Sequence, residues 1–178
     1  MTHVIYFVAA SLDGYIAGPQ DELDWLPPID PQGEDYGYQS FYAGVDGVVM
    51  GRRTYEICRR LGPWPYEGKP GWVWTRGAPP ADLPPGVQAT SSSPVALHRA
   101  WSRKGLQRVF LVGGAQTARA FLDAGVLHEW VLATVPFTLG AGIPLFAPRP
   151  QAAAVVWQRI ALQEHSRGVL RTTWRPTP

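Results

Sequence analysis

Two short segments, each at the junction of an apolar strand and a helix, contain residue types that could hold anionic groups. They consist of Gly51, Arg52, Arg53 and Thr54 in the first segment, and of Val112, Gly113, Gly114, Ala115, Gln116 and Thr117 in the second. The unpaired N–H groups and the dipole of a helix start attract anions, and glycine lets a ligand approach the backbone closely. Together the segments predict a site for a ligand with a pyrophosphate or several phosphates.

Each segment also has a simpler interpretation. The first could be only a helix start with two solvated arginines, and Gly113 and Gly114 could serve only to pack a strand against a helix. The Gly-x-Gly-x-x-Gly pattern of ordinary dinucleotide sites does not occur in the sequence. It is the occurrence of two such junctions in one chain that favours phosphate binding.

Two carboxylates are candidates for catalysis. Asp13 follows an apolar run in the turn Ser11-Leu12-Asp13-Gly14, where it could hydrogen-bond an amino or imino group of a heterocycle or help deliver a proton. Asp35 stands near the start of a predicted helix and could do the same. The alternatives are that Asp13 only stabilises the turn, and that Asp35 is only an acidic residue at a helix start, where the helix dipole favours it. Trp25, on a predicted loop, could stack on a flat substrate.

Several other kinds of site are not expected. The four histidines are scattered along the sequence, so we expect no metal site. The single cysteine, Cys58, can form neither an internal disulfide nor a cysteine-based zinc site, and it fits a reducing, cytoplasmic compartment.

Charge and hydropathy exclude two classes of partner. The formal net charge is +2, and the basic residues form no run longer than a pair, so no nucleic-acid surface is expected. The apolar run 4–10 is too short to span a membrane. A chain of 178 residues is long enough for one domain with a sizeable core, and we predict a single domain over residues 1–178.

Hydrophobic patterns predict alternating strands and helices. The expected strands are 4–10, 45–50, 72–74, 107–112, 128–135, 155–163 and 169–174, and the expected helices are 34–43, 52–61, 94–104 and 115–124. Residues 17–33, 77–86 and 136–150 are expected to be loops, and the last two strands form a hairpin. This order predicts an α/β domain with a mostly parallel sheet.

Four motifs resemble, in order, those of the dihydrofolate reductase superfamily, and within it the stand-alone relatives of the riboflavin-biosynthesis reductase domain. They are Ser11-Leu12-Asp13-Gly14-Tyr15-Ile16-Ala17, Met50-Gly51-Arg52-Arg53-Thr54-Tyr55-Glu56, Val112-Gly113-Gly114, and Thr138-Leu139-Gly140-Ala141-Gly142-Ile143-Pro144-Leu145-Phe146. The His-x-Glu and paired cysteines of the zinc deaminase that is often fused to that domain are missing from the sequence.

The resemblance implies a three-layer sandwich with a mostly parallel central sheet, flanking helices and a C-terminal antiparallel hairpin. It also implies NADPH across the carboxyl ends of the strands and hydride transfer to a C=N or C=O bond of a pterin or pyrimidine, in a homodimer. Transferred to this sequence, the cofactor site has four parts. They are Ala10 and Ile16 near the nicotinamide, Gly51 to Thr54 at the phosphates, Thr75 and Arg76 near the adenine ribose, and Val112, Gly113, Gly114, Ala115, Gln116 and Thr117 over the pyrophosphate and nicotinamide.

Three hypotheses about function remain open from the sequence. The first is an NADPH-dependent reductase of a small heterocycle. The second is a dimeric nucleotide-binding module of the same fold without catalysis, which the lack of an obvious proton donor favours. The third is a phosphate-binding transferase that would prefer another nucleotide.

Overall fold

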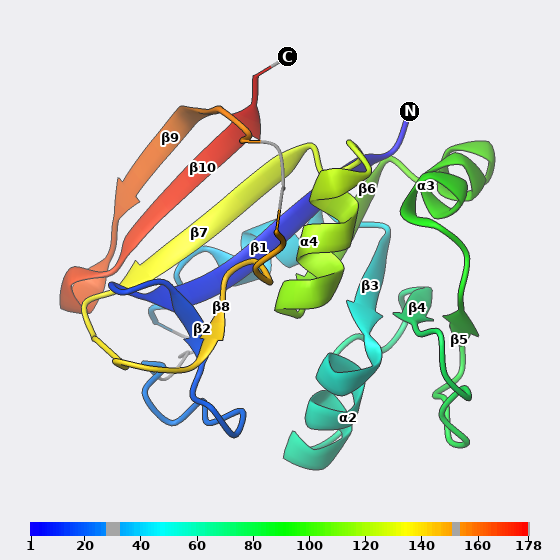
Figure 1. The fold of residues 1–178 in the computed structure, drawn as a ribbon, viewed down its shortest axis with the longest axis horizontal. Coiled ribbons are helices and arrows are strands. Elements are labelled where there is room, and N and C mark those ends of the chain that lie inside the picture. The colour runs from blue at the N-terminus through cyan, green and yellow to red at the C-terminus, as the bar shows by residue number, and fades with distance from the viewer. Residues whose placement is uncertain (28–32, 151–153, 178) are drawn as a thin grey trace.

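The computed structural model describes residues 1–27, 33–150 and 154–177, and in these ranges a large sheet lies between helices on its two faces (Figure 1). The strands of this sheet are β1 His3–Ser11, β3 Gly47–Gly51, β4 Gly71–Trp74, β5 Val87–Thr90, β6 Arg108–Gly113, β7 Glu129–Val135, β9 Trp157–Glu164 and β10 Leu170–Pro176. Their spatial order is β5-β4-β3-β6-β1-β7-β10-β9. The strands from β5 to β7 pair in parallel, whereas β10 is antiparallel to both β7 and β9.

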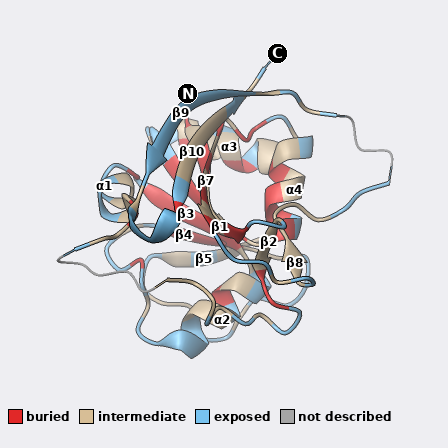
Figure 2. Ribbon diagram, turned by 90° about the vertical axis from the view of Figure 1, so that its left-hand side faces the viewer, coloured by how far each residue is buried: buried red, intermediate tan, exposed pale blue. Residues whose placement is uncertain are grey.

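The helices cover both faces because the central strands are apolar on both sides. The helices are α1 Tyr38–Ala43, α2 Arg52–Leu61, α3 Pro94–Arg103 and α4 Ala115–Asp123. Leu97 and Trp101 of α3 and Phe121 of α4 pack on one face of the sheet. Tyr55 of α2 packs on the other face, together with aromatic side chains of α1. The buried residues accordingly concentrate in the central strands and on the inner sides of the helices (Figure 2).

The three-layer α/β architecture, the mostly parallel sheet and the C-terminal hairpin predicted from the sequence are confirmed. Ser93 begins α3 as a side-chain cap, since its Oγ accepts a hydrogen bond from the Ala96 amide at 3.2 Å. Among the described residues, no helix has the length and apolar character that a bilayer crossing requires.

Some predicted boundaries were wrong. The helix predicted over 34–43 begins only at Tyr38, because Gly37 is left-handed, with a φ of 75°. Strand β5 was not predicted at all, since it is only four residues long and follows a proline-rich loop. The hairpin strand predicted over 155–163 lies at 157–164. Of the predicted loop 17–33, residues 28–32 lie outside the described ranges.

A second, two-stranded sheet joins two segments that the sequence indicated to be irregular. Strand β2, Tyr15–Ala17, pairs antiparallel with β8, Ile143–Pro144, which lies in the predicted 136–150 loop. Short strands of this kind have no hydrophobic pattern of their own and depend on pairing between distant segments. The pairing brings the chain after β1 and the chain after β7 to the same edge of the main sheet (Figure 1).

Candidate active site

A large cleft, with a volume of about 1280 Å³, lies at the carboxyl ends of the parallel strands. Its walls come from the starts of α2 and α4, the ends of β1 and β6, and the segments around β2 and β8. All of the predicted cofactor residues line this cleft except Ala10 and Gly113, which are buried beside it. Ala9, the neighbour of Ala10, lines the cleft instead. A parallel α/β sheet usually binds its ligand at this edge.

The starts of α2 and α4 are neighbours at the cleft, because α2 follows β3, α4 follows β6, and these two strands are paired. Neither helix has a side-chain cap. The cap positions are Gly51 and Gly114, which have no side chain that could accept a hydrogen bond from the N–H groups of the first turn. A Cβ on Gly51 would lie 2.5 Å from Oγ1 of Thr117, and a Cβ on Gly114 would lie 3.3 Å from Oγ1 of Thr54. The two glycines therefore allow two helix starts to converge on one volume.

The two arginines of the first junction are already paired. Arg52 donates from Nε to Glu56 Oε1 at 2.7 Å and from Nη1 to the carbonyl oxygen of Ala78 at 2.8 Å. Arg53 donates from Nε to Oδ2 of Asp21 at 2.9 Å. Both pairs are solvated, since the Arg52 and Arg53 side chains are 45% and 63% exposed. Such exposed pairs contribute little to stability, which leaves the guanidinium groups able to exchange partners.

Three further arginines and Asp123 also line the cleft. Arg76 lies over the ring of Trp74, 5.8 Å from its centroid, next to Thr75. Asp123 accepts hydrogen bonds from both Arg119 and Arg149, and these contacts lower the pKa of its carboxyl group. Sequence reasoning missed Arg119 and Arg149 because they come from the middle of a helix and from a loop, with no glycine motif to mark them.

Asp13 does not line the cleft and instead holds the loop that follows β7. Its carboxylate accepts hydrogen bonds from the Ser11 hydroxyl at 2.6 Å and from the backbone amides of Leu139 at 3.1 Å and Gly140 at 2.7 Å. The Ser11 contact, followed by the two amide contacts, lowers the pKa of Asp13 to about 2. The geometry favours a structural role, and the catalytic role considered for Asp13 has no support in the cleft.

An Asp13→Asn variant is expected to be less stable than the wild type near neutral pH, because an amide cannot accept all three hydrogen bonds. A carboxyl group whose pKa is lower in the folded than in the unfolded state stabilises the folded protein fully at pH values above the unfolded pKa, about 3.9. This stabilisation is lost as the pH falls toward the folded-state pKa of about 2. The difference in thermal midpoint should therefore shrink between about pH 4 and pH 2. Asp24→Asn, at an exposed aspartate, is the control. A difference that stays constant over this pH range would contradict the assignment.

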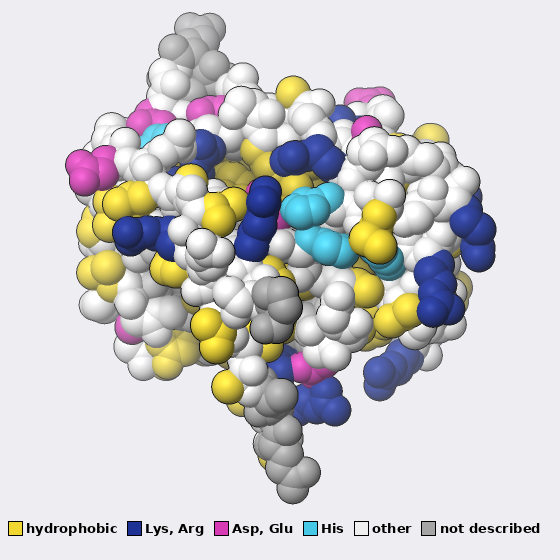
Figure 3. Space-filling model, turned by 90° about the horizontal axis from the view of Figure 1, so that it is seen from above, with side chains coloured by type: hydrophobic (Ala, Val, Ile, Leu, Met, Phe, Trp, Pro, Cys, Tyr) yellow, Lys and Arg dark blue, Asp and Glu magenta, His cyan; other side chains and the backbone are white. Residues whose placement is uncertain are grey.

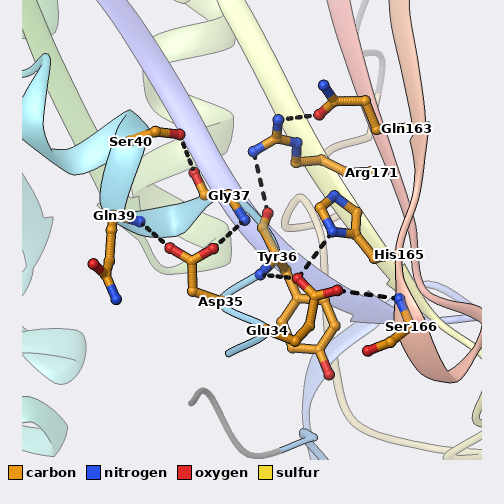
Figure 4. A network of polar contacts seen from close by, with 10 residues as sticks. All are labelled: Glu34, Asp35, Tyr36, Gly37, Gln39, Ser40, Gln163, His165, Ser166 and Arg171. Carbon is orange, nitrogen blue, oxygen red and sulfur yellow. Dashed lines mark hydrogen bonds and ion pairs between the residues drawn. The ribbon is translucent and has the colours of Figure 1, made fainter. Parts of the chain in front are cut away.

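Asp35 also lies outside the cleft, in a network that ties the start of α1 to the C-terminal hairpin (Figure 4). Its two carboxylate oxygens accept the backbone amides of Gly37 at 2.8 Å and Gln39 at 2.7 Å. The neighbouring Glu34 contacts Nδ1 of His165 at 3.0 Å and accepts the Ser166 amide at 3.1 Å. The contacts of Asp35 support the simpler interpretation, a carboxylate at a helix start.

The part of the cleft nearest α1 is apolar and was not predicted. It is lined by side chains of β1, α1, α2 and β6, namely Phe7, Tyr38, Ile57, Cys58, Leu61, Phe110 and Val112, with Leu23 and Leu26 of the loop after β2. Trp25, considered above for stacking on a substrate, does not line the cleft and lies 6.3 Å from Phe137, ring to ring. The sequence predicted a helix that contains Tyr38, but not the cleft beside it.

Three of the histidines meet at the opposite edge of the sheet, and Figure 3 shows histidine side chains close to Lys or Arg side chains on this side of the molecule. The ring of His128 lies 5.2 Å from that of His3 and 5.1 Å from that of His98. His128 accepts the Val4 amide through Nδ1, and burial, with His3 and His98 nearby, lowers its pKa to about 4. Within the part of the chain that the structure describes, no group of His, Cys, Asp or Glu could hold a metal ion.

Comparison with known proteins agrees with this geometry. The uncharacterized protein YwjB of Bacillus subtilis is 34% identical over 143 residues, which cover 80% of this chain and 81% of YwjB. A Shewanella sp. PV-4 protein, provisionally assigned to riboflavin biosynthesis, has a crystal structure with 30% identity and a TM-score of 0.87, covering 99% of this chain and 100% of that one.

The fold extends to a more distant group. Dihydrofolate reductase from Enterococcus faecalis, complexed with NADP(H) and RAB-propyl, superposes with a TM-score of 0.69 at 18% identity, covering 99% of this chain and 97% of that one. The family model for the RibD C-terminal domain matches residues 73–170, more than half of the sequence. The chain therefore belongs to the RibD C-terminal domain family, and it shares its fold with a dihydrofolate reductase.

Proposed function

We propose that this protein is an NADPH-dependent reductase that transfers a hydride to a C=N or C=O bond of a small heterocycle of the pterin or pyrimidine type. The observation that carries the proposal is the convergence of two uncapped helix starts on one cleft, with a glycine at each start and arginines beside them. Such a site favours a pyrophosphate. The similarity to a dihydrofolate reductase complexed with NADP(H) adds support.

The residues of the cleft fit this cofactor in type and position. Backbone amides at the starts of α2 and α4 would bind the pyrophosphate, and Arg52 and Arg53 would bind the 2′-phosphate. Thr75 and Arg76 would contact the adenine ribose, and Ile16 and Val112 would flank the nicotinamide. When bound, the cofactor supplies the hydride, while the protein provides orientation and electrostatics.

A titration with NADPH and NADH, followed by quenching of tryptophan fluorescence, tests the proposal. Trp74 lines the cleft near Arg76, so a bound cofactor should quench part of the signal. We expect NADPH to bind at least tenfold more tightly than NADH, because only NADPH carries the phosphate that the arginines would bind. Absence of binding by both, or tight binding of another nucleotide alone, would contradict the proposal.

A second candidate function is a nucleotide-binding module without catalysis. The observation in its favour is that Asp13 and Asp35, the two candidate catalytic carboxylates, are held by backbone amides outside the cleft. This candidate predicts NADPH binding without NADPH oxidation in the presence of a panel of pterins and pyrimidines. Oxidation of NADPH with any of these compounds would exclude it.

We also propose that the protein acts in the cytoplasm as a homodimer, and without a nucleic-acid or membrane partner. The C-terminal hairpin supports a dimer, since Ile160, Leu162 and Leu170 are 43%, 47% and 40% exposed on adjacent strands. Exposed apolar residues that cluster on one surface are typical of protein interfaces. Light scattering at several concentrations would measure the mass, and a monomer at all of them would exclude the dimer.

A further inference from the structure

Three histidine side chains from different parts of the chain meet at the edge of the sheet opposite the cleft. They are His3 at the start of β1, His98 of α3, and His128 immediately before β7. The ring of His128 contacts both of the others, with centroid distances of 5.2 Å to His3 and 5.1 Å to His98 and interplanar angles of 32° and 30°. A change of charge on His128 would therefore act on β1, α3 and β7 together.

The hydrogen bonds of two of these rings show where their protons lie. The Val4 amide donates to Nδ1 of His128 at 3.1 Å. Because an amide N–H can only donate, this nitrogen must carry a lone pair, so His128 is neutral with its proton on Nε2. His98 Nε2 lies 2.8 Å from the carbonyl oxygen of Thr2, which can only accept, so that nitrogen carries a proton. The bond of His98 persists when its ring is charged, whereas the bond of His128 does not.

The charged groups near His128 would not compensate a positive charge on its ring. The other two histidines can carry only the same sign of charge. Glu129, the next residue, contacts His3 at 3.5 Å and accepts hydrogen bonds from Arg175 at 3.0 and 3.2 Å, so its carboxylate is already paired. Arg108 of β6 is the strand neighbour of His3 and adds a further positive charge. Among the described residues, no carboxylate contacts the His128 ring.

The Val4 amide belongs to the segment that attaches the start of β1 to α3 and β7. The backbone amide of His128 donates to the carbonyl oxygen of Val4 at 3.0 Å. On the side of α3, the Thr2 amide donates to Oγ of Ser102 at 3.0 Å, and Thr2 Oγ1 donates to the carbonyl oxygen of Leu106 at 2.8 Å. A proton on Nδ1 of His128 would turn an acceptor into a second donor. The Val4 amide, in a fully buried residue, would then lose its partner, which is strongly unfavourable.

We infer that the three histidines form an acid-sensitive attachment point, at which proton uptake by His128 breaks the bond to Val4 and loosens the start of β1 from α3 and β7. None of these histidines lines the cleft, so the inference does not depend on the proposed function. Histidine is the side chain whose charge most readily changes between neutral and mildly acidic pH. The anchoring of the first strand is thereby made a function of pH.

The sign of the effect follows from the surroundings of His128. Burial, followed by the charges of His3 and His98, lowers its pKa to about 4, against an opposing hydrogen bond with the backbone of Val126. An unfolded histidine has a pKa of about 6.5. The stability associated with a neutral His128 is therefore fully present above about pH 6.5 and is lost as the pH falls toward 4. This interval lies above the one expected for Asp13, so the two effects can be separated.

Hydrogen exchange of the full chain at pH 7 and pH 5 tests the inference without any substitution. After correction for the intrinsic pH dependence of exchange, the protection of the Val4 amide should fall roughly tenfold or more at pH 5. Ring-proton NMR of the wild type should show a titration of His128 with a midpoint near pH 4. Unchanged protection of Val4, or a midpoint of about 6.5 as in an unfolded chain, would overturn the inference.

His128→Asn is the matched variant, because the asparagine Oδ1 can accept the Val4 amide in place of Nδ1 and takes up no proton. In this variant the protection of Val4 should change less than about twofold between pH 7 and pH 5. The control is His98→Gln, which removes another titratable ring but keeps a donor for the Thr2 carbonyl. It should retain most of the pH dependence, since burial contributes more than His98. Full pH dependence in His128→Asn, or its loss in His98→Gln, would contradict the assignment to His128.

Discussion

An Arg52→Ala, Arg53→Ala double variant is expected to bind NADPH roughly a hundredfold more weakly than the wild type. A hydrogen bond between charged groups contributes about 1.5–3 kcal/mol, and two would be lost. We expect a loss at the lower end of this range, because Arg52 and Arg53 must first break their hydrogen bonds to Glu56 and Asp21 before they bind a phosphate. Fluorescence titration measures the change, and NADH affinity should fall much less because that cofactor has no 2′-phosphate.

A matched control lies on the same helix. Arg59→Ala, Arg60→Ala removes the same charge from the last turn of α2, where neither side chain lines the cleft. This variant should keep NADPH affinity within about twofold, because solvent and salt screen charges at that distance. Equal losses in the two double variants would mean that net charge alone, and not a phosphate site at the start of α2, attracts the cofactor.

Trp101→Ala is expected to lower the free energy of unfolding by about 3–5 kcal/mol, the usual range for removing a large buried aromatic side chain. Trp101 is only 1% exposed, and it packs against Phe121 at 6.1 Å and Trp72 at 5.2 Å between ring centroids. The variant would leave a cavity between α3, α4 and the sheet. Denaturant unfolding measures the loss, which corresponds to a fall of roughly 10 °C in thermal midpoint.

Trp101→Phe separates packing from hydrogen bonding. The indole Nε1 of Trp101 is buried and has no hydrogen-bond partner among the described residues. A phenylalanine removes that unpaired donor while keeping a ring between Phe121 and Trp72, so it should cost much less than alanine. If both variants lost the same stability, the contribution of Trp101 could not come mainly from its ring.

The sequence predicted the fold well because its strongest signals are local. Continuous apolar runs mark β1, β3 and β6, and the glycines at the ends of β3 and β6 mark the helix starts that line the cleft. The pairing of β2 with β8 could not be predicted, since each strand is too short for a pattern. Similarly, β5 is a four-residue edge strand whose existence depends on its contact with β4.

The candidate catalytic carboxylates show what local patterns cannot decide. The position of Asp13 after the first strand was equally consistent with a substrate contact and with a role in the turn. Two of its three hydrogen-bond partners, Leu139 and Gly140, are more than a hundred residues away in the chain. Tyr38 lies in a helix that the sequence predicted, but only the contacts with the sheet reveal that it lines a cleft.

The pairing of Asp21 with Arg53 has a thermodynamic consequence for the segment between β2 and α1. A phosphate that binds the Nε of Arg53 must displace the Asp21 carboxylate, so Asp21 acts as an intramolecular competitor for the anion. By thermodynamic linkage, an interaction that stabilises the pair of Asp21 and Arg53 weakens anion binding, and a bound anion weakens that pair by the same free energy. Leu23 and Leu26 follow Asp21 and line the apolar part of the cleft nearest α1. Occupancy of the proposed phosphate site would therefore weaken the contact between Asp21 and Arg53 at the start of this segment.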